Sequence, residues 1–186
     1  MQIKPAIGVI KSECTTFRFD FETLKSLREE AKQKDISTNT LLNQIVKEHL
    51  RWHANASNAG FIAVTRLLIT NLISHLSEQQ IISIAENVAK NTNKDSILLI
   101  EKEYTMKSAL DFIESWIRIS GYKYRHEEIN NGQNKHLYVI QHDMGMKWSI
   151  YLANLYQSLF DEVRKDRKII EFEKTENTLA FTVDID

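Results

Sequence analysis

Apolar and polar residues alternate one by one near the start of the chain, and the apolar spacing then lengthens. Phe17, Phe19 and Phe21 alternate with polar neighbours, which predicts a short strand with one buried face. From Phe21 onward the apolar positions fall three or four residues apart, which predicts a helix capped by Asp20. A second helix is expected after Ser37, a second capping candidate. Its apolar stripe consists of Leu41, Leu42, Ile45, Val46 and Leu50. The chain thus opens with one strand and two helices, and no second strand lies nearby to pair with the first.

A helical connector is predicted over residues 59–92, after the turn-forming sequence NASNAG. One helix of this connector is expected from Phe61 to Leu76. Ser77 and Gln80 then form a capping-box pattern, which predicts the start of another helix. The polar sequence NTNKD, residues 91–95, is expected to be a further linker.

Residues 95–186 are predicted to form a separate α/β domain. The uninterrupted apolar run Ser96–Ile100 is typical of a strand buried on both faces. A helix, a β-hairpin turning at Asn131–Gly132, another helix and two more strands are expected after it. The expected helices are Met106–Ser120 and Trp148–Val163, and the expected strands are Tyr122–Ile129, Lys135–Gln141, Lys168–Glu173 and Thr178–Asp184. The succession β-α-β-β-α-β with one extra strand predicts a ferredoxin-like domain, and the chain as a whole is assigned to the α+β class.

The composition is that of an ordinary globular protein. Of the 186 residues, 42% are apolar and 26% are charged. No apolar run approaches the roughly 20 residues needed to cross a bilayer, and the first residues lack the features of a signal peptide. We therefore expect a cytoplasmic protein without membrane contact. The single cysteine, Cys14, excludes an internal disulfide and a zinc site made of several cysteines.

Charge is distributed unevenly, although the formal net charge is −1. Residues 1–53 contain nine Lys and Arg against seven Asp and Glu, whereas residues 101–186 contain twelve against fifteen. Proteins that bind nucleic acid usually carry a clear basic surface. The basic excess of the first segment is small by that standard.

The unpaired strand gives the strongest indication of function. Its backbone N–H and C=O groups need partners, and the simplest partner is the same strand of a second copy, antiparallel about a two-fold axis. A two-stranded ribbon of this kind fits the major groove of DNA. The strand sequence TTFRFD, the connection KDIS and the polar helix start STNT occur in this order. With these features, residues 13–53 resemble the ribbon-helix-helix family of DNA-binding proteins.

The resemblance implies which residues touch DNA. In that family the outward strand residues read base edges, and the start of the second helix holds a phosphate. By position, the base-reading residues are Thr16 and Arg18, with Cys14 as a weaker third, and the phosphate-contacting residues are Thr38, Asn39 and Thr40. Arginine can donate two hydrogen bonds to guanine, and a helix N-terminus attracts anions. In an ordinary α+β domain, the same arginine would simply be solvated.

The function implied by the resemblance is sequence-specific transcriptional regulation, for example as a repressor. The expected partners are double-stranded DNA and a second copy of the chain, in dimers or in tetramers, and no cofactor is expected. Two alternatives are kept. One is an antitoxin-like module that binds another protein. The other is a metal-responsive regulator, because His126, His136 and His142 fall in or beside the predicted hairpin and imidazole binds nickel, copper and zinc.

The sequence predicts no enzymatic activity. It contains none of the patterns G-x-G-x-x-G, G-K-[ST], H-E-x-x-H and G-x-S-x-G. The sequence HDMGMKWS places Gly145, Lys147 and Ser149 at the start of a predicted helix, where an anion can bind. A turn glycine beside a solvated lysine is the favoured interpretation of this stretch.

Overall fold

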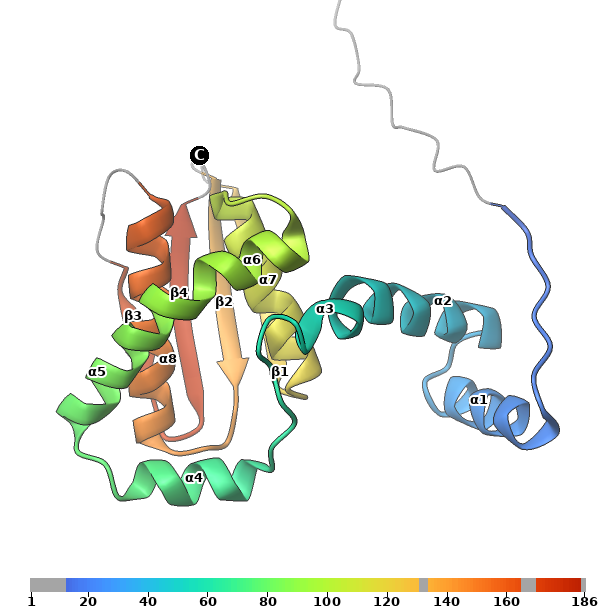
Figure 1. Ribbon diagram of the computed structural model, residues 1–186, viewed down its shortest axis with the longest axis horizontal. Helices are drawn as coiled ribbons and strands as arrows, with labels where there is room; N and C mark the ends of the chain where they lie inside the picture. Colours follow the sequence, from blue (N-terminus) through green and yellow to red (C-terminus); the bar gives the residue numbers. More distant parts are fainter. Residues whose placement is uncertain (1–12, 131–133, 165–169, 185–186) are drawn as a thin grey trace, which may run out of the picture. The chain divides into compact units, whose positions relative to one another are not determined.

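The computed structural model describes residues 13–130, 134–164 and 170–184. The chain is of mixed α+β type and divides after Lys47 into two compact units, each described by itself (Figure 1). The helices are α1 (Phe21–Gln33), α2 (Thr38–Glu48), α3 (Ala54–Ala56), α4 (Arg66–Ser74), α5 (Glu78–Val88), α6 (Lys94–Glu101), α7 (Met106–Ile119) and α8 (Met146–Val163). The strands are β1 (Lys123–Asn130), β2 (Asn134–Gln141), β3 (Phe172–Lys174) and β4 (Thr178–Asp184). Two π-helical turns, His49–His53 and Ala89–Asn93, follow α2 and α5.

The first unit consists of α1 and α2 after residues 13–20, which are neither helix nor strand in the single chain. The strand predicted over this segment is therefore not formed in the single chain, which offers no partner strand there among the described residues. The predicted cap of α1 is confirmed, because a carboxylate oxygen of Asp20 accepts a hydrogen bond of 2.8 Å from the backbone N–H of Thr23. The predicted cap of α2 is confirmed as well, since Ser37 Oγ accepts from the N–H of Thr40 at 3.0 Å. Both helices therefore begin where the sequence predicts.

Trp52 belongs to the second unit, although the sequence suggested that it closes the DNA-binding segment. Its side chain is 3% exposed, and its ring centroid lies 4.8 Å from that of Phe61 and 5.6 Å from that of Phe112. The helical stretch that begins with α2 continues through the π-helical turn and α3, so the division after Lys47 falls inside a helix.

The helices α4 and α5 pack on α8 and are part of the second unit. Helix α4 begins later than predicted, because the Thr65 hydroxyl caps it by accepting from the N–H of Leu68. The predicted capping box at the start of α5 is confirmed: Ser77 and Gln80 each accept a hydrogen bond from the other's backbone N–H.

Two predictions for residues 91–100 are wrong. The expected linker 91–95 and the expected strand Ser96–Ile100 are helical, in the second π-helical turn and in α6. Ile97 and Ile100 are buried whereas Leu98 is exposed, so the apolar run covers one side of a helix. The four apolar residues that follow Ser96 are too few to show whether the period is that of a helix or of a strand.

The second unit contains an antiparallel sheet in the order β1-β2-β4-β3. The predicted hairpin is confirmed by the pairing of β1 with β2, and its expected turn at Asn131–Gly132 lies outside the described residues. The ferredoxin-like succession is not formed, because the residues of its expected first strand, Ser96–Ile100, belong to helix α6. Of the expected strand Lys168–Glu173, residues 168 and 169 also lie outside the described part, and the observed strand is Phe172–Lys174.

One ring from each strand joins a row that crosses the whole sheet. His126 of β1 stacks on Tyr138 of β2 at 4.4 Å between centroids, and Tyr138 lies 5.2 Å from Phe181 of β4. Phe172 of β3 completes the row at 5.4 Å from Phe181. These residues are direct cross-strand partners, so they project from the same face of the sheet.

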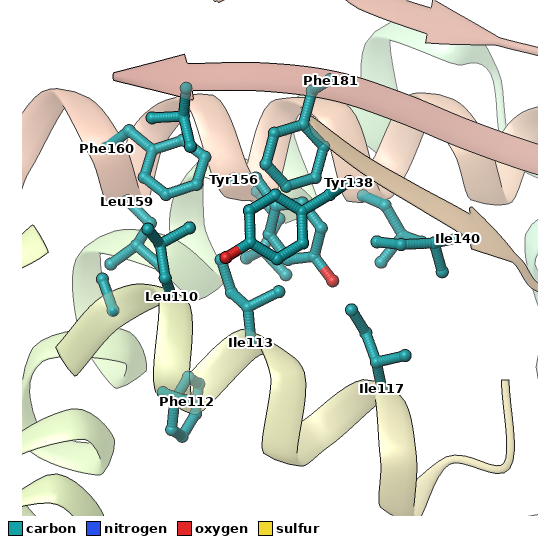
Figure 2. Packing of buried hydrophobic residues seen from close by; sticks show 14 of the residues in the cluster. Leu110, Phe112, Ile113, Ile117, Tyr138, Ile140, Tyr156, Leu159, Phe160 and Phe181 are labelled. Carbon is teal, nitrogen blue, oxygen red and sulfur yellow. The ribbon is translucent and has the colours of Figure 1, made fainter. Parts of the chain in front are cut away.

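Helices α7 and α8 cover this face of the sheet. Figure 2 shows Tyr138 and Phe181 pointing toward Ile113 of α7 and toward Tyr156 and Phe160 of α8. All five side chains are almost completely buried. The second unit therefore has a continuous apolar core between one sheet face and two helices.

Phe181→Ala should lower the free energy of unfolding by about 3–5 kcal/mol, because it removes a buried ring from the middle of the row and leaves a cavity. Urea denaturation followed by circular dichroism measures this change. Thr182→Ala is the matched control, since Thr182 is the next residue of β4 and is exposed. Its effect should stay within about 0.5 kcal/mol. Equal effects of the two substitutions would contradict the described core.

Candidate nucleic-acid interface

The three predicted base-reading residues, Cys14, Thr16 and Arg18, are exposed. The rings of Phe17 and Phe19 lie 6.5 Å apart between centroids. In an extended chain, residues two apart project to the same side and their neighbours to the other side. When residues 13–20 are extended as a strand, Thr16 and Arg18 therefore lie opposite the aromatic pair.

The start of α2 has the features of an anion site. Thr38 is partly buried, and Asn39 and Thr40 are exposed. The first turn of the helix contains no acidic residue. The backbone N–H groups at the first positions of a helix have no partner within the helix, and they carry a partial positive charge. Part of the hydrogen-bonding capacity of the Thr40 hydroxyl is already used, because this group lies 2.8 Å from Ser37 Oγ.

The first unit leaves half of its described large apolar side chains exposed. Among its described residues only Ala31 and Leu41 are buried. Phe17 is 63% exposed and Phe21 is 76% exposed. The exposed large apolar residues of this unit are Phe17, Phe19, Phe21, Ile45 and Val46. A surface of this kind on so small a unit is typical of an interface with another chain.

Two of the three predicted metal-binding histidines lie together. His126 Nε2 is 2.8 Å from His136 Nδ1, and His126 Nδ1 is 3.0 Å from a carboxylate oxygen of Glu114 on α7. His142 follows the end of β2, six residues after His136, and its ring nitrogens contact Met144 and Ser149 instead. Among the described residues, no three His, Cys, Asp or Glu side chains are grouped so that they can hold a metal ion. The structure thus brings together two histidines and not three.

His142 holds the start of α8 against the loop between β3 and β4. Its Nδ1 accepts a hydrogen bond of 3.0 Å from the N–H of Met144, so its proton is on Nε2, which lies 2.8 Å from Ser149 Oγ. The Ser149 hydroxyl in turn donates to the carbonyl of Thr175 at 2.6 Å. His142 is completely buried, and this burial lowers the pKa of its imidazole, with the charge of Asp143 acting in the opposite direction. The imidazole is therefore a neutral structural group.

The alternative anion site around HDMGMKWS is occupied by groups of the protein itself. Lys147 Nζ donates to the carbonyl oxygens of Ser74 and Leu76, each at 2.7 Å, and so caps the end of α4. The N–H of Met146 donates to a carboxylate oxygen of Glu176 at 3.3 Å. The favoured interpretation of a turn glycine is confirmed, since Gly145 precedes α8 with a φ of +86°. Lys147, however, is a capping residue and not a solvated one.

Sequence reasoning missed a cavity in the second unit that all three tryptophans line, Trp52, Trp116 and Trp148. They come from three separate helical segments, and no spacing in the sequence relates them. The only feature that the three tryptophans share along the chain is a position close to one end of a helical segment. That feature alone does not indicate a cavity.

No protein-family model matches the chain, and the comparisons with curated proteins and with solved structures give no match. Within the described residues, no helix combines the length and the apolar character needed to cross a membrane.

Acidification from pH 7 to pH 5 should lower the free energy of unfolding, in part through His142. Below about pH 6.5 the unfolded chain takes up a proton on this imidazole, whereas the folded chain does so only at lower pH. The unfolded state then binds more protons, so stability decreases as the pH falls. His142→Gln should give a shallower pH dependence in urea titrations at pH 5 and pH 7. His75→Gln removes an exposed imidazole and is the matched control. A slope in the His142 variant as steep as that of the wild type would contradict this assignment.

Proposed function

We propose that the protein is a dimeric, sequence-specific DNA-binding transcriptional regulator of the ribbon-helix-helix type. The observation that carries the proposal is the uncovered apolar side of residues 17–21 in a unit with only two buried residues among those described. These aromatic rings are stabilised by contact with further apolar surface, which the described residues of this unit do not provide. The same segment of a second copy supplies both the missing apolar surface and the missing strand partner.

A two-stranded ribbon accounts for the polar residues as well as the apolar ones. Phe17 and Phe19 face the helices of the dimer, and Thr16 and Arg18 face away from them toward the base edges. Thr38, Asn39 and Thr40 lie at a helix start without acidic residues, where a DNA phosphate is attracted by the N–H groups. Shape and hydrogen bonding thus carry specificity, because the basic excess of this segment is small.

The second unit is proposed to regulate the DNA-binding unit or to strengthen the assembly of its copies. It has a core of its own between the sheet and the helices α7 and α8. In this proposal the second unit is stabilised by its own core, whereas the first unit buries its apolar rings only in the dimer.

Replacement of both Phe17 and Phe19 by serine should convert a dimer into a monomer at micromolar concentration. Burial of one phenylalanine contributes about 1.5–3 kcal/mol, so the dissociation constant should rise by at least about 100-fold. Light scattering of the full chain measures the mass. Arg18→Ala is the matched control and should remain dimeric, since Arg18 lies on the other side of the ribbon. A monomeric wild-type protein under these conditions would refute the ribbon.

Arg18→Ala should weaken binding to the preferred operator by about 1–3 kcal/mol, which is the contribution of a bidentate contact to guanine. The operator is obtained by selecting bound DNA from a random pool, and it should have two-fold symmetry. Arg125→Ala is the control, because Arg125 is an exposed arginine of β1 in the second unit. Unchanged affinity of the Arg18 variant would remove Arg18 as a base reader, and failure to enrich any DNA would overturn the proposed function.

A further inference from the structure

The second unit contains a cavity of about 610 Å³ between Trp52, the segment that leads into α4, the end of α7 and the start of α8. Aromatic rings form much of its wall: Trp52, Phe61, Trp116, Tyr122 and Trp148. This volume lies within the range of small-molecule sites, which are mostly apolar with a few polar groups that orient the ligand.

The charges around this aromatic cavity have one sign. Among the described residues that line it, the ionisable side chains are Arg66, His53 and Tyr122, and none is an Asp or Glu. Burial is the main cause that raises the pKa of Tyr122, with Trp148 and Arg66 acting in the opposite direction. Tyr122 is therefore a neutral phenol at physiological pH, and its hydroxyl donates to Met144 Sδ at 3.0 Å. No carboxylate of the described residues thus lines the cavity, and the carboxylate of Glu48 lies behind His53, 3.7 Å from its Nε2.

The guanidinium of Arg66 is held in place at this cavity. Its Nη2 donates to the carbonyl oxygens of Ser120 and Gly121 at 3.0 and 2.9 Å, and its Cζ lies 5.2 Å from the centre of the Tyr122 ring. A Cβ at Gly121 would lie 3.4 Å from Nη2, so the glycine permits this close approach. Within the described part of the chain, Nε and Nη1 of Arg66 make no hydrogen bond, and they are available to a ligand. Arginine presents such N–H groups as a planar fork that matches a carboxylate.

We propose that this aromatic cavity binds a small amphipathic acid, an aromatic monocarboxylate whose ring lies among the tryptophans and whose carboxylate pairs with Arg66. The apolar wall accounts for the ring, and the guanidinium of Arg66, which forms no ion pair among the described residues, accounts for the acid. The site is independent of the proposed DNA binding, because its residues all belong to the second unit.

Tryptophan fluorescence tests the proposal directly, because the chain has three tryptophans and all of them line the cavity. The full-length protein, without DNA, is titrated with 4-phenylbutyrate, with 4-phenylbutylamine, which has a similar body and the opposite charge, and with butyrate, which lacks the ring. A saturable change should occur with 4-phenylbutyrate at a Kd at least tenfold lower than with either other compound. Equal affinities for the acid and the amine, or no response to the acid, would overturn the proposal.

Variants locate the bound acid. Arg66→Gln should weaken binding of 4-phenylbutyrate by about tenfold or more, since a hydrogen bond to a charged group is lost. Arg66→Lys should retain the preference for the acid over the amine. Ala63→Phe places a ring at an exposed residue of the lining, so it should block binding without disturbing the core. Arg125→Gln is the charge-matched control and should bind like the wild type. If the Ala63 and Arg66→Gln variants, folded by circular dichroism, bind as tightly as the wild type, the acid binds elsewhere and the proposal is wrong.

Discussion

The row of rings that crosses the sheet is the interaction on which the second unit depends. His126, Tyr138, Phe181 and Phe172 come from four strands, and each ring contacts the next one across the strand pairing. A shift of any strand by one residue would turn its ring to the opposite face, away from α7 and α8. The row therefore fixes the register of the sheet, and it also forms the surface on which both helices pack.

The described residues of the first unit, 13–47, form no comparable set of internal contacts. Its rings are as apolar as those of the sheet, but Phe17 and Phe21 are mostly in water in the single chain. In the proposed dimer, four rings from Phe17 and Phe19 of two copies contribute on the order of 10 kcal/mol before the loss of translational and rotational freedom is subtracted. The same physical force thus acts within one chain in the second unit and, in the proposed dimer, between two chains in the first.

Local signals in the sequence predicted many of the elements correctly. Asp20 and the pair Ser77 and Gln80 mark helix starts through hydrogen bonds between residues three apart, so they can be read without knowing the fold. The strand prediction for Ser96–Ile100 is wrong because its four apolar residues suit a helix face as well as a strand. These residues form helix α6, so the first strand of the expected ferredoxin-like domain is not formed. This one wrong assignment accounts for the wrong prediction of the domain topology.

The candidate sites depend on contacts between distant residues, which sequence patterns do not contain. Lys147 caps α4 from a position more than 70 residues later in the chain, and this contact replaces the expected solvated lysine. Nothing in the sequence distinguishes His142 from the histidines of the predicted hairpin. Its buried hydrogen bonds to Met144 and Ser149 give it a structural role. The tryptophan cavity is assembled from separate helical segments for the same reason.

The π-helical turn between α5 and α6 has a consequence for how the chain tolerates insertions and deletions. A turn of this type accommodates an additional residue within a helix. The additional residue is taken up within the turn, so α6 keeps the orientation that places Ile97 and Ile100 in the core. Loss of one residue from Ala89–Asn93 would leave an ordinary α-helical turn with nearly the same orientation of α6, because four residues at about 100° each complete about one turn. Insertion of a further residue would instead rotate α6 by about 100° relative to α5 and move Ile97 and Ile100 out of the core. This short turn should therefore accept the loss of one residue more readily than the gain of one.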